Sequence, residues 1–417
     1  MARNRVAPSA MRSTRAALIP RGSTSTATLP RSENCWCGGA KNWPAARSGP
    51  RPAGNGRDGE TVGAVAPVGV GAPVGEWRKR RPAPGENAML LTRALIALLF
   101  AALLIPSAAT AQPAWQLPDT VEHKPVDIWS EGTRMAGDLY WPADAPDGAS
   151  LPAIVMSHGW GGTKAGLRRN AAVFAADGFV VLAFDYRGWG ESDGKLVVLG
   201  AMPERGVNGE VQVTAQEIRR VVDPLDQTLD IRRAFDFIEG EPNVDLDRLG
   251  YWGSSYSGAH AIWAAANEPR VACAVGQVAA ANSLDLAQTS WKDTGVDIEQ
   301  YAREQAIRRA RGEIAPLPQR TDKAPNLNGW AHLDKVLEYR PVNDAHRITI
   351  PLLVIDAEHE ELFDRHQAGE LSVERAKANG ARAEYRVIPE ISHYGIYREA
   401  FEESARMALD WFNDCLK

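Results

Sequence analysis

The sequence predicts an α/β fold with a doubly wound, mainly parallel sheet and helices on both faces. Short apolar segments alternate with segments whose apolar residues recur at helical spacing between residues 151 and 412. The segment 179–184 has no polar residue, as expected for a strand buried on both faces. Strands that alternate with helices favour parallel pairing through crossover helices, and this combination predicts the fold class.

The elements follow in order from these patterns. Segments 126–129 and 135–141 flank the turn at 131–133, which predicts an opening hairpin and an antiparallel edge. Further strands are predicted at 153–156, 179–184, 248–252, 271–277, 352–356 and 384–388. Helices are predicted at 167–176, 224–239, 257–267, 364–379 and 399–412. The block 283–346 is polar and irregularly helical, with its best helix at 298–311, and is expected to form a cap inserted after the sixth strand.

Charge divides the chain into two parts. Residues 1–88 hold 14 Lys or Arg and 5 Asp or Glu, a net charge of +9, whereas residues 89–417 carry a net charge of −14. The basic part is rich in Pro, Gly, Ala and Ser and has no sustained apolar period, so we expect it to be disordered. The acidic part argues against nucleic acid as a partner.

Residues 89–111 have the anatomy of a secretory signal. A short basic start precedes the apolar run 94–105, and Ala109-Thr110-Ala111 stands just before Gln112. An apolar helix of about 18 Å is too short for a hydrocarbon core of about 30 Å, so no stable membrane anchor is expected. We therefore expect translation from Met89 and an exported domain, periplasmic or secreted, at 112–417. Residues 1–88 are then untranslated, with a disordered pro-region as the alternative.

Two cysteines, Cys273 and Cys415, remain in the exported part. Export permits a disulfide. Cys273 lies in the apolar run 271–275 and is expected to be buried, so we do not expect the two cysteines to pair.

A serine-rich turn joins the predicted strand 248–252 to the next helix. A nucleophile on such a turn adopts a strained backbone, so the residues two before and two after it must be small. Ser255 meets this rule, because Gly253 precedes it and Ser257 follows it. Ser254 fails it, since its corresponding neighbours are both aromatic, and Ser257 itself would lie inside the helix. Ser255 is the candidate nucleophile.

A base must take the proton of a serine hydroxyl to make it nucleophilic. In a sheet of this kind the acid and then the histidine come after the nucleophile, each on a loop that follows a strand. Eight histidines follow residue 112, and only His393 comes after the final predicted strand. His393 is therefore the candidate base.

The acid is expected on the loop after the predicted strand 352–356. Glu360 lies where the turn directs a carboxylate back toward the histidine, and either Asp or Glu can serve there. Asp356 and Asp364 remain alternatives, whereas Glu358 and Glu361 are expected to be solvated.

The glycine-rich run 157–162 is the candidate anion pocket. Cleavage of an ester places negative charge on the carbonyl oxygen, and each fixed N–H donor stabilises that charge by about 3 kcal/mol. The expected donors are the backbone N–H groups of Trp160 and of Tyr256, which follows the nucleophile. No Lys-Ser/Thr pair follows in the phosphate-loop pattern, which argues against phosphate binding.

Four motifs together resemble the α/β-hydrolase superfamily. They are the segments 158–162, 184–192, 253–258 and 392–394. Within the superfamily, the sequence is most similar to dienelactone-hydrolase-like serine hydrolases, with a fainter likeness in Gly-x-Ser-Tyr-x-Gly to the X-Pro dipeptidyl peptidases. The resemblance spans about residues 120–415 and implies the α/β-hydrolase fold and a serine mechanism.

The sequence departs from the superfamily pattern at three positions. Ser257 replaces the usual second glycine of the nucleophile turn, and Glu360 stands where Asp is commoner. Ser255 stands where true dienelactone hydrolases carry Cys, so that particular activity is not expected.

These residues predict an exported serine hydrolase that cleaves a small carboxylic ester through an acyl-enzyme, without cofactor or metal. Only His359 and His366 approach a metal-ligand spacing. The alternatives are a peptidase or amidase with the same triad and, less favoured, a binding module without catalysis. The cap is expected to select the substrate, with Trp291, Tyr301 and Trp330 either lining the entrance or packing the cap onto the body.

Overall fold

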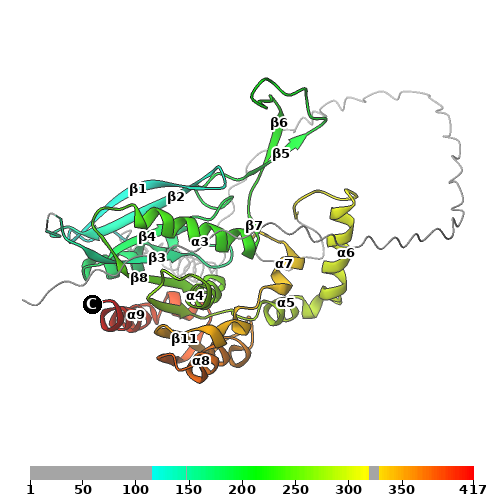
Figure 1. Cartoon of the computed structure of the whole chain (residues 1–417). Helices are drawn as coiled ribbons and strands as arrows, with labels where there is room; N and C mark the ends of the chain where they lie inside the picture. Colours follow the sequence, from blue (N-terminus) through cyan, green and yellow to red (C-terminus); the bar gives the residue numbers. More distant parts are fainter. Residues whose placement is uncertain (1–114, 147, 319–327) are drawn as a thin grey trace, which may run out of the picture. The chain divides into compact units, whose positions relative to one another are not determined.

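The computed structural model describes residues 115–146, 148–318 and 328–417 (Figure 1). The segments predicted to be untranslated, 1–88, and to form the signal, 89–111, lie outside the described residues. The described residues belong to one compact unit. Within the described part of the chain, no helix combines the length and the apolar character needed to cross a membrane.

An eight-stranded sheet forms the centre of this unit, in the order β1-β2-β4-β3-β8-β9-β11-β12. Its strands are β1 (Val121–Ser130), β2 (Thr133–Pro142), β3 (Leu151–Ser157), β4 (Val180–Phe184), β8 (Val244–Ser254), β9 (Cys273–Gln277), β11 (Leu352–His359) and β12 (Ala383–Ser392). Strand β2 is antiparallel to both of its neighbours, and all other pairs are parallel. The predicted mainly parallel sheet with an antiparallel edge is confirmed.

Helices cover both faces of the sheet (Figure 1). They are α2 (Arg168–Ala176), α3 (Pro224–Glu239), α4 (Tyr256–Asn267), α8 (Gly369–Ala378) and α9 (Phe401–Leu416). Apolar side chains of α3, α4 and α8 belong to one buried cluster, and those of α2 and α9 belong to a second. Helix α3 begins where the sequence predicts, because Asp223 accepts the N–H groups of Leu225 and Asp226 and Pro224 opens the helix.

The segment 283–346 contains α5 (Ser283–Trp291), α6 (Ile298–Ala310) and α7 (Leu333–Glu338). A small apolar cluster joins these helices, and the rings of Trp291 and Tyr301 lie 5.5 Å apart within it. These two aromatic residues therefore pack inside the segment. Short 3-10 turns complete the fold: η1 (Lys164–Leu167), η2 (Lys292–Thr294), η3 (Pro341–Asn343), η4 (Ala345–Arg347), η5 (Arg365–Gln367) and η6 (Gly395–Tyr397).

Two small strand pairs were not predicted from the sequence. Strands β5 (Lys195–Leu199) and β6 (Thr214–Ile218) form a separate hairpin (Figure 1), and β7 (Val221–Val222) pairs with β10 (Trp330–Ala331). The hairpin has exposed apolar side chains, Leu196 and Leu199 among them, so it lacks the buried pattern that marks a core strand. The β7–β10 pair ties the segment 283–346 to the chain before α3.

A disulfide joins Cys273 and Cys415, and the expectation that they do not pair is wrong. Cys273 is buried on β9, as expected. Helix α9 packs on that strand and brings the two Cα atoms to 6.2 Å, within the range that a disulfide spans. Burial and pairing are compatible here because the partner comes from a helix that covers the same face.

Candidate active site

Ser255 lies on a tight turn between β8 and α4. Its φ of +61° is rarely adopted by a residue with a side chain. A Cβ at Gly253 would stand 2.0 Å from the carbonyl oxygen of Ser257, so only glycine fits two residues before the serine. The N–H of Ser255 donates to the carbonyl of Gln277 at 2.8 Å, which ties the turn to β9. The steric rule applied to the sequence therefore describes the turn that the chain adopts.

A cluster of buried hydroxyl groups lies beneath this turn. Ser257 Oγ and Ser157 Oγ lie 2.5 Å apart, and the Tyr186 hydroxyl donates to Ser157 Oγ at 2.5 Å. The Tyr251 hydroxyl lies 3.1 Å from Ser257 Oγ, and burial raises the pKa of Tyr251 to about 12. The serine that replaces the usual glycine thus links α4 to β3 and β8. Sequence reasoning missed this cluster, because no local pattern marks hydroxyls that meet only in the folded chain.

The structure brings Ser255, His393 and Glu360 together. His393 Nε2 lies 3.0 Å from Ser255 Oγ, and His393 Nδ1 lies 2.7 Å from Glu360 Oε2. The other oxygen of Glu360 accepts the N–H of Leu362 at 3.0 Å. The side chains of His393 and Glu360 are only 2% and 1% exposed, so this hydrogen-bonded pair lies away from solvent. The three residues come from the ends of β8, β11 and β12, at one edge of the sheet.

The two alternative acids do not contact His393. Asp356 is fully buried and accepts the N–H of Ala279 at 3.0 Å; burial raises its pKa to about 7. Asp364 is exposed and accepts the N–H of His366 at 2.9 Å, which caps the short turn η5. Neither carboxylate is placed to orient the imidazole.

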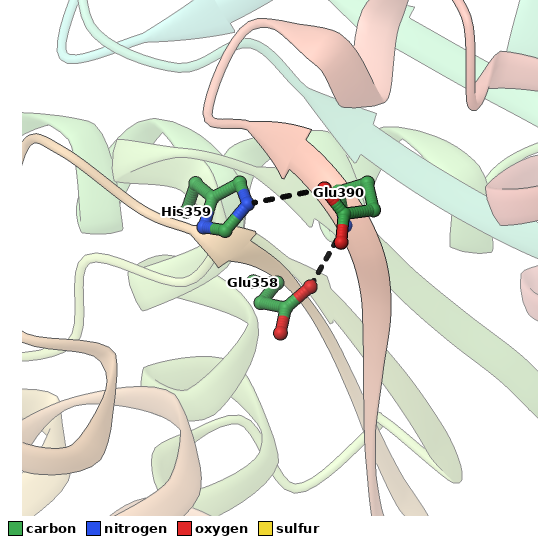
Figure 2. Close-up of side chains that lie close together, drawn as sticks. All are labelled: Glu358, His359 and Glu390. Atoms are coloured by element: carbon green, nitrogen blue, oxygen red, sulfur yellow. Dashed lines mark hydrogen bonds and ion pairs between the residues drawn. The ribbon is translucent and has the colours of Figure 1, made fainter.

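Glu358 and Glu361 are solvated, as the sequence predicts, and each carboxylate also accepts a hydrogen bond from the backbone. Both residues are exposed, yet Glu361 Oε2 accepts the backbone N–H of His393 at 2.8 Å. Glu358 Oε2 accepts the backbone N–H of Glu390, also at 2.8 Å (Figure 2). These two hydrogen bonds were not predicted, because both partners are backbone groups of β12 and of the residue after it, 32 residues further along the chain.

The two expected oxyanion donors face the same cavity as the nucleophile. Trp160 and Tyr256 line it with Ser255 and His393, and their rings meet edge-on with centroids 5.3 Å apart. A Cβ at Gly159 would lie 2.8 Å from the Cβ of Ser255, so glycine lets this loop reach the nucleophile. Within the described chain, the N–H groups of Trp160 and Tyr256 are both without a hydrogen-bond partner.

The cavity has a volume of about 460 Å³ and is mainly apolar. Besides the catalytic candidates, its walls include Trp160, Leu167, Leu286, Leu362, Phe363, Tyr394 and Tyr397. Among the described residues, no Lys, Arg, Asp or Glu side chain lines it. The segment 283–346 contributes Leu286, on α5, and Asn328 to the wall. The three aromatic residues considered for the entrance, Trp291, Tyr301 and Trp330, do not line the cavity.

His158 lies within the glycine-rich run 157–162, directly before Gly159, and is almost completely buried. Burial lowers the pKa of its imidazole, although the carboxylate of Asp185, 3.9 Å away, acts in the opposite direction. His158 Nδ1 lies 2.9 Å from the carbonyl oxygen of Gly159 and supports the loop. This histidine is consequently a supporting residue of the pocket wall.

Residues 131–379 match the model of the X-Pro dipeptidyl-peptidase family (S15 family). The match covers more than half of the chain. The chain belongs to this family. The matched residues include Ser255 and Glu360 and end before His393. The sequence alone showed only a faint likeness to this family of X-Pro dipeptidyl peptidases. The family lies within the α/β-hydrolase superfamily, so the resemblance to that superfamily is confirmed.

Curated relatives extend this placement. The chain is 28% identical over 290 residues to an uncharacterized 31.7 kDa protein in the traX-finO intergenic region of Escherichia coli, covering 63% of this chain and 90% of that protein. It is 29% identical over 162 residues to the quorum-quenching protein AidA of Acinetobacter baumannii, covering 38% of this chain and 45% of AidA. It is 36% identical over 142 residues to the thiohydrolase aneE of Aspergillus aculeatus, covering 34% and 36%.

Solved structures share the fold. The hypothetical protein PA2218 from Pseudomonas aeruginosa superimposes with a TM-score of 0.54 at 23% identity, covering 72% of this chain and 96% of that one. The α/β hydrolase GrgF from Penicillium gives a TM-score of 0.54 at 19% identity, covering 71% and 99%. This S15-family chain is accordingly a hydrolase of the α/β-hydrolase type.

Proposed function

We propose that the chain is an exported serine hydrolase that cleaves a carboxylic ester through a Ser255–His393–Glu360 triad. The observation that carries the proposal is the continuous line of hydrogen bonds, 3.0 Å from serine to imidazole and 2.7 Å from imidazole to carboxylate. A serine whose hydroxyl contacts a base, itself oriented by a third group, is the signature of an activated nucleophile. The two free backbone N–H groups at the same cavity complete the set.

The reaction follows from this geometry. Ser255 Oγ attacks the carbonyl carbon while His393 Nε2 takes the hydroxyl proton, and the N–H groups of Trp160 and Tyr256 bind the oxyanion. The alcohol leaves with the proton from His393, and an acyl-enzyme remains on Ser255. Water then attacks the acyl group and gives its proton to His393, which returns it to Ser255 as the carboxylic acid departs. Glu360 stabilises the imidazolium at both stages.

The cavity favours an uncharged, apolar acyl or alcohol group. Its walls are largely aromatic and aliphatic, and the described lining offers no opposite charge to a charged substrate. A charge buried without a partner costs several kcal/mol (about 3 or more), so such a substrate binds poorly. A contribution of Leu286 to the wall supports the proposal that segment 283–346 acts as a cap that selects the substrate.

The family match favours a peptidase as the second candidate. Release of a dipeptide from a free N-terminus requires the enzyme to receive an ammonium group near the scissile bond, and a carboxylate is the usual partner of a buried ammonium. No described Asp or Glu side chain lines the cavity. The alkoxide of an ester also leaves more readily than the amine anion of an amide. Both points support the esterase.

A matched substrate panel tests the choice. We expect purified 112–417 to hydrolyse an aryl ester of a short acyl chain with a kcat/KM at least about 100-fold above that of the matching anilide, a difference of about 3 kcal/mol in barrier. A thioester of the same acyl group belongs in the panel, because one relative is named a thiohydrolase. An X-Pro anilide with a free N-terminus turned over faster than its ester would assign the chain as a peptidase.

Export is the second part of the proposal, and the disulfide supports it. Disulfides form and persist in oxidising compartments and are rare in the cytosol. Cys273 and Cys415 are both within the domain that follows the predicted signal. We expect N-terminal sequencing of the exported protein to begin at Gln112 or within a few residues of it. An intact product that retains residues 1–88 would contradict both the signal and the start at Met89.

A further inference from the structure

The loop that carries Glu360 and the loop that carries His393 lie side by side at the ends of β11 and β12. The parallel pairing of the two strands is regular up to Ala357 opposite Ile388 and resumes at His359 opposite Ser392. One residue of β11 therefore faces three residues of β12. Such a bulge interrupts the regular ladder of hydrogen bonds immediately before the histidine.

Three carboxylates, one at the end of β11 and two in the loop after it, bind β12 and the histidine that follows it across this bulge. Glu358 accepts the N–H of Glu390 at 2.8 Å, Glu361 accepts the N–H of His393 at 2.8 Å, and Glu360 lies 2.7 Å from the His393 ring. We call Glu358, Glu360 and Glu361 the carboxylate clamp. Its members accept hydrogen bonds from Glu390 and His393 at the point where the pairing between β11 and β12 is interrupted.

We propose that Glu361 is a positioning residue for His393, holding the backbone of the histidine while Glu360 holds its ring. This inference rests on the proposed function, because it gives the clamp a role only if His393 is the base. Two successive residues of one loop thus grip one histidine at two separate points, Nδ1 and the backbone nitrogen. A single contact at the ring would leave the imidazole free to move with its loop.

Small displacements of a base have large kinetic effects. A misplacement of about 1 Å can cost about 100-fold in rate, because proton transfer requires hydrogen-bond distance to the hydroxyl. The end of β12 before His393 has its own irregularity, since Glu390 adopts a φ of +59°. The bond from Glu358 to the N–H of Glu390 holds that residue, and the bond from Glu361 holds the histidine itself. We therefore assign the larger kinetic effect to Glu361.

Glu358, His359 and Glu390 also bring their side-chain donor atoms within 4.8 Å of one another (Figure 2). All three residues are exposed, and one oxygen of Glu358 already accepts a backbone N–H. We therefore interpret Glu358 as a member of the clamp and not as a metal ligand.

The test compares Glu361→Ala with Glu361→Gln in the full exported domain. Alanine removes the acceptor for the His393 N–H, whereas glutamine keeps an oxygen in the same place and removes only the charge. We expect Glu361→Ala to lower kcat on the aryl ester on the order of tenfold with KM unchanged. Glu361→Gln is expected to retain most of the wild-type kcat. Glu358→Ala is expected to lower kcat less. Turnover is expressed per Ser255 labelled by a fluorophosphonate, so unfolded protein is not counted.

Glu374→Ala is the matched control. Glu374 lies exposed on α8, and its side chain makes no hydrogen bond or ion pair with any residue that the structure describes. We expect this variant to keep the wild-type kcat. A wild-type kcat in Glu361→Ala, or a loss that glutamine does not restore, would overturn the positioning role while the wild-type enzyme still reacts at Ser255. If the wild-type enzyme is neither labelled at Ser255 nor active, the proposed function and the clamp are both wrong.

Discussion

Replacing Ser255 with alanine is expected to lower kcat on the preferred ester by about a millionfold and to abolish labelling by a fluorophosphonate. The Ser255 oxygen is the only protein atom in the proposed mechanism that forms a bond to the acyl group, and His393 cannot replace it while it serves as the base. The fold is expected to persist, since the substitution removes one hydroxyl that contacts His393 Nε2 at the cavity wall. Thermal unfolding of the two proteins, measured beside turnover, checks this.

Ser257→Ala is the companion variant for the nucleophile. Its hydroxyl is buried beneath the turn and bonded to Ser157, so it does not reach substrate. We expect this variant to be less stable, because the partner hydroxyls lose a bond, and still to be labelled at Ser255. Peptide mapping of the labelled wild-type protein, which retains both serines, decides the position. A label on residue 257, or full activity in Ser255→Ala, would remove Ser255 from the mechanism.

Glu360→Gln is expected to lower kcat by about 10,000-fold with little change in KM. The amide is nearly the same size and can still accept the N–H of Leu362, so the loop keeps its shape. It loses the charge that stabilises the imidazolium, and its NH₂ group opposes a protonated Nδ1, which favours the wrong tautomer of His393. KM should hold, because Glu360 does not line the cavity. Steady-state kinetics beside a melting curve measure both effects.

The two carboxylates once considered for this role provide the comparison. Asp356→Asn and Asp364→Asn each replace a carboxyl group near Glu360 with an amide of the same size, and neither residue contacts His393. Both variants are expected to retain most of the wild-type kcat. A loss of several orders of magnitude in either one, with Glu360→Gln active, would transfer the role of the acid.

The sheet and the three triad candidates were predictable from short sequence patterns and from the expected order of the strands. Ser255 follows from a steric rule that involves only the residues two before and two after it. A strand buried on both faces is recognisable in the sequence as an apolar run. Glu360 and His393 follow from topology, because the carboxyl ends of neighbouring parallel strands meet at one edge of a sheet. That Glu360 and His393 lie close together could therefore be predicted without knowledge of side-chain packing.

The features that escaped prediction depend on packing between distant segments. The bond to Cys415 requires α9 to settle on β9, which no pattern near either cysteine indicates. The role of Glu361 depends on a bulge in the neighbouring strand that sets the His393 N–H opposite its carboxylate. The β5–β6 hairpin is exposed, so the burial that makes a strand recognisable is missing there.

The bond between Cys273 and Cys415 closes a covalent ring that contains Glu360 and His393 and leaves Ser255 outside. A chain nicked once by a protease inside this ring remains one molecule, and it separates into two fragments on electrophoresis only after reduction. The tether ends on β9, the strand hydrogen-bonded to the one that carries the nucleophile. A molecule nicked inside the ring therefore keeps its two fragments covalently joined, with one end of the link on the strand beside Ser255, and this link is lost on reduction.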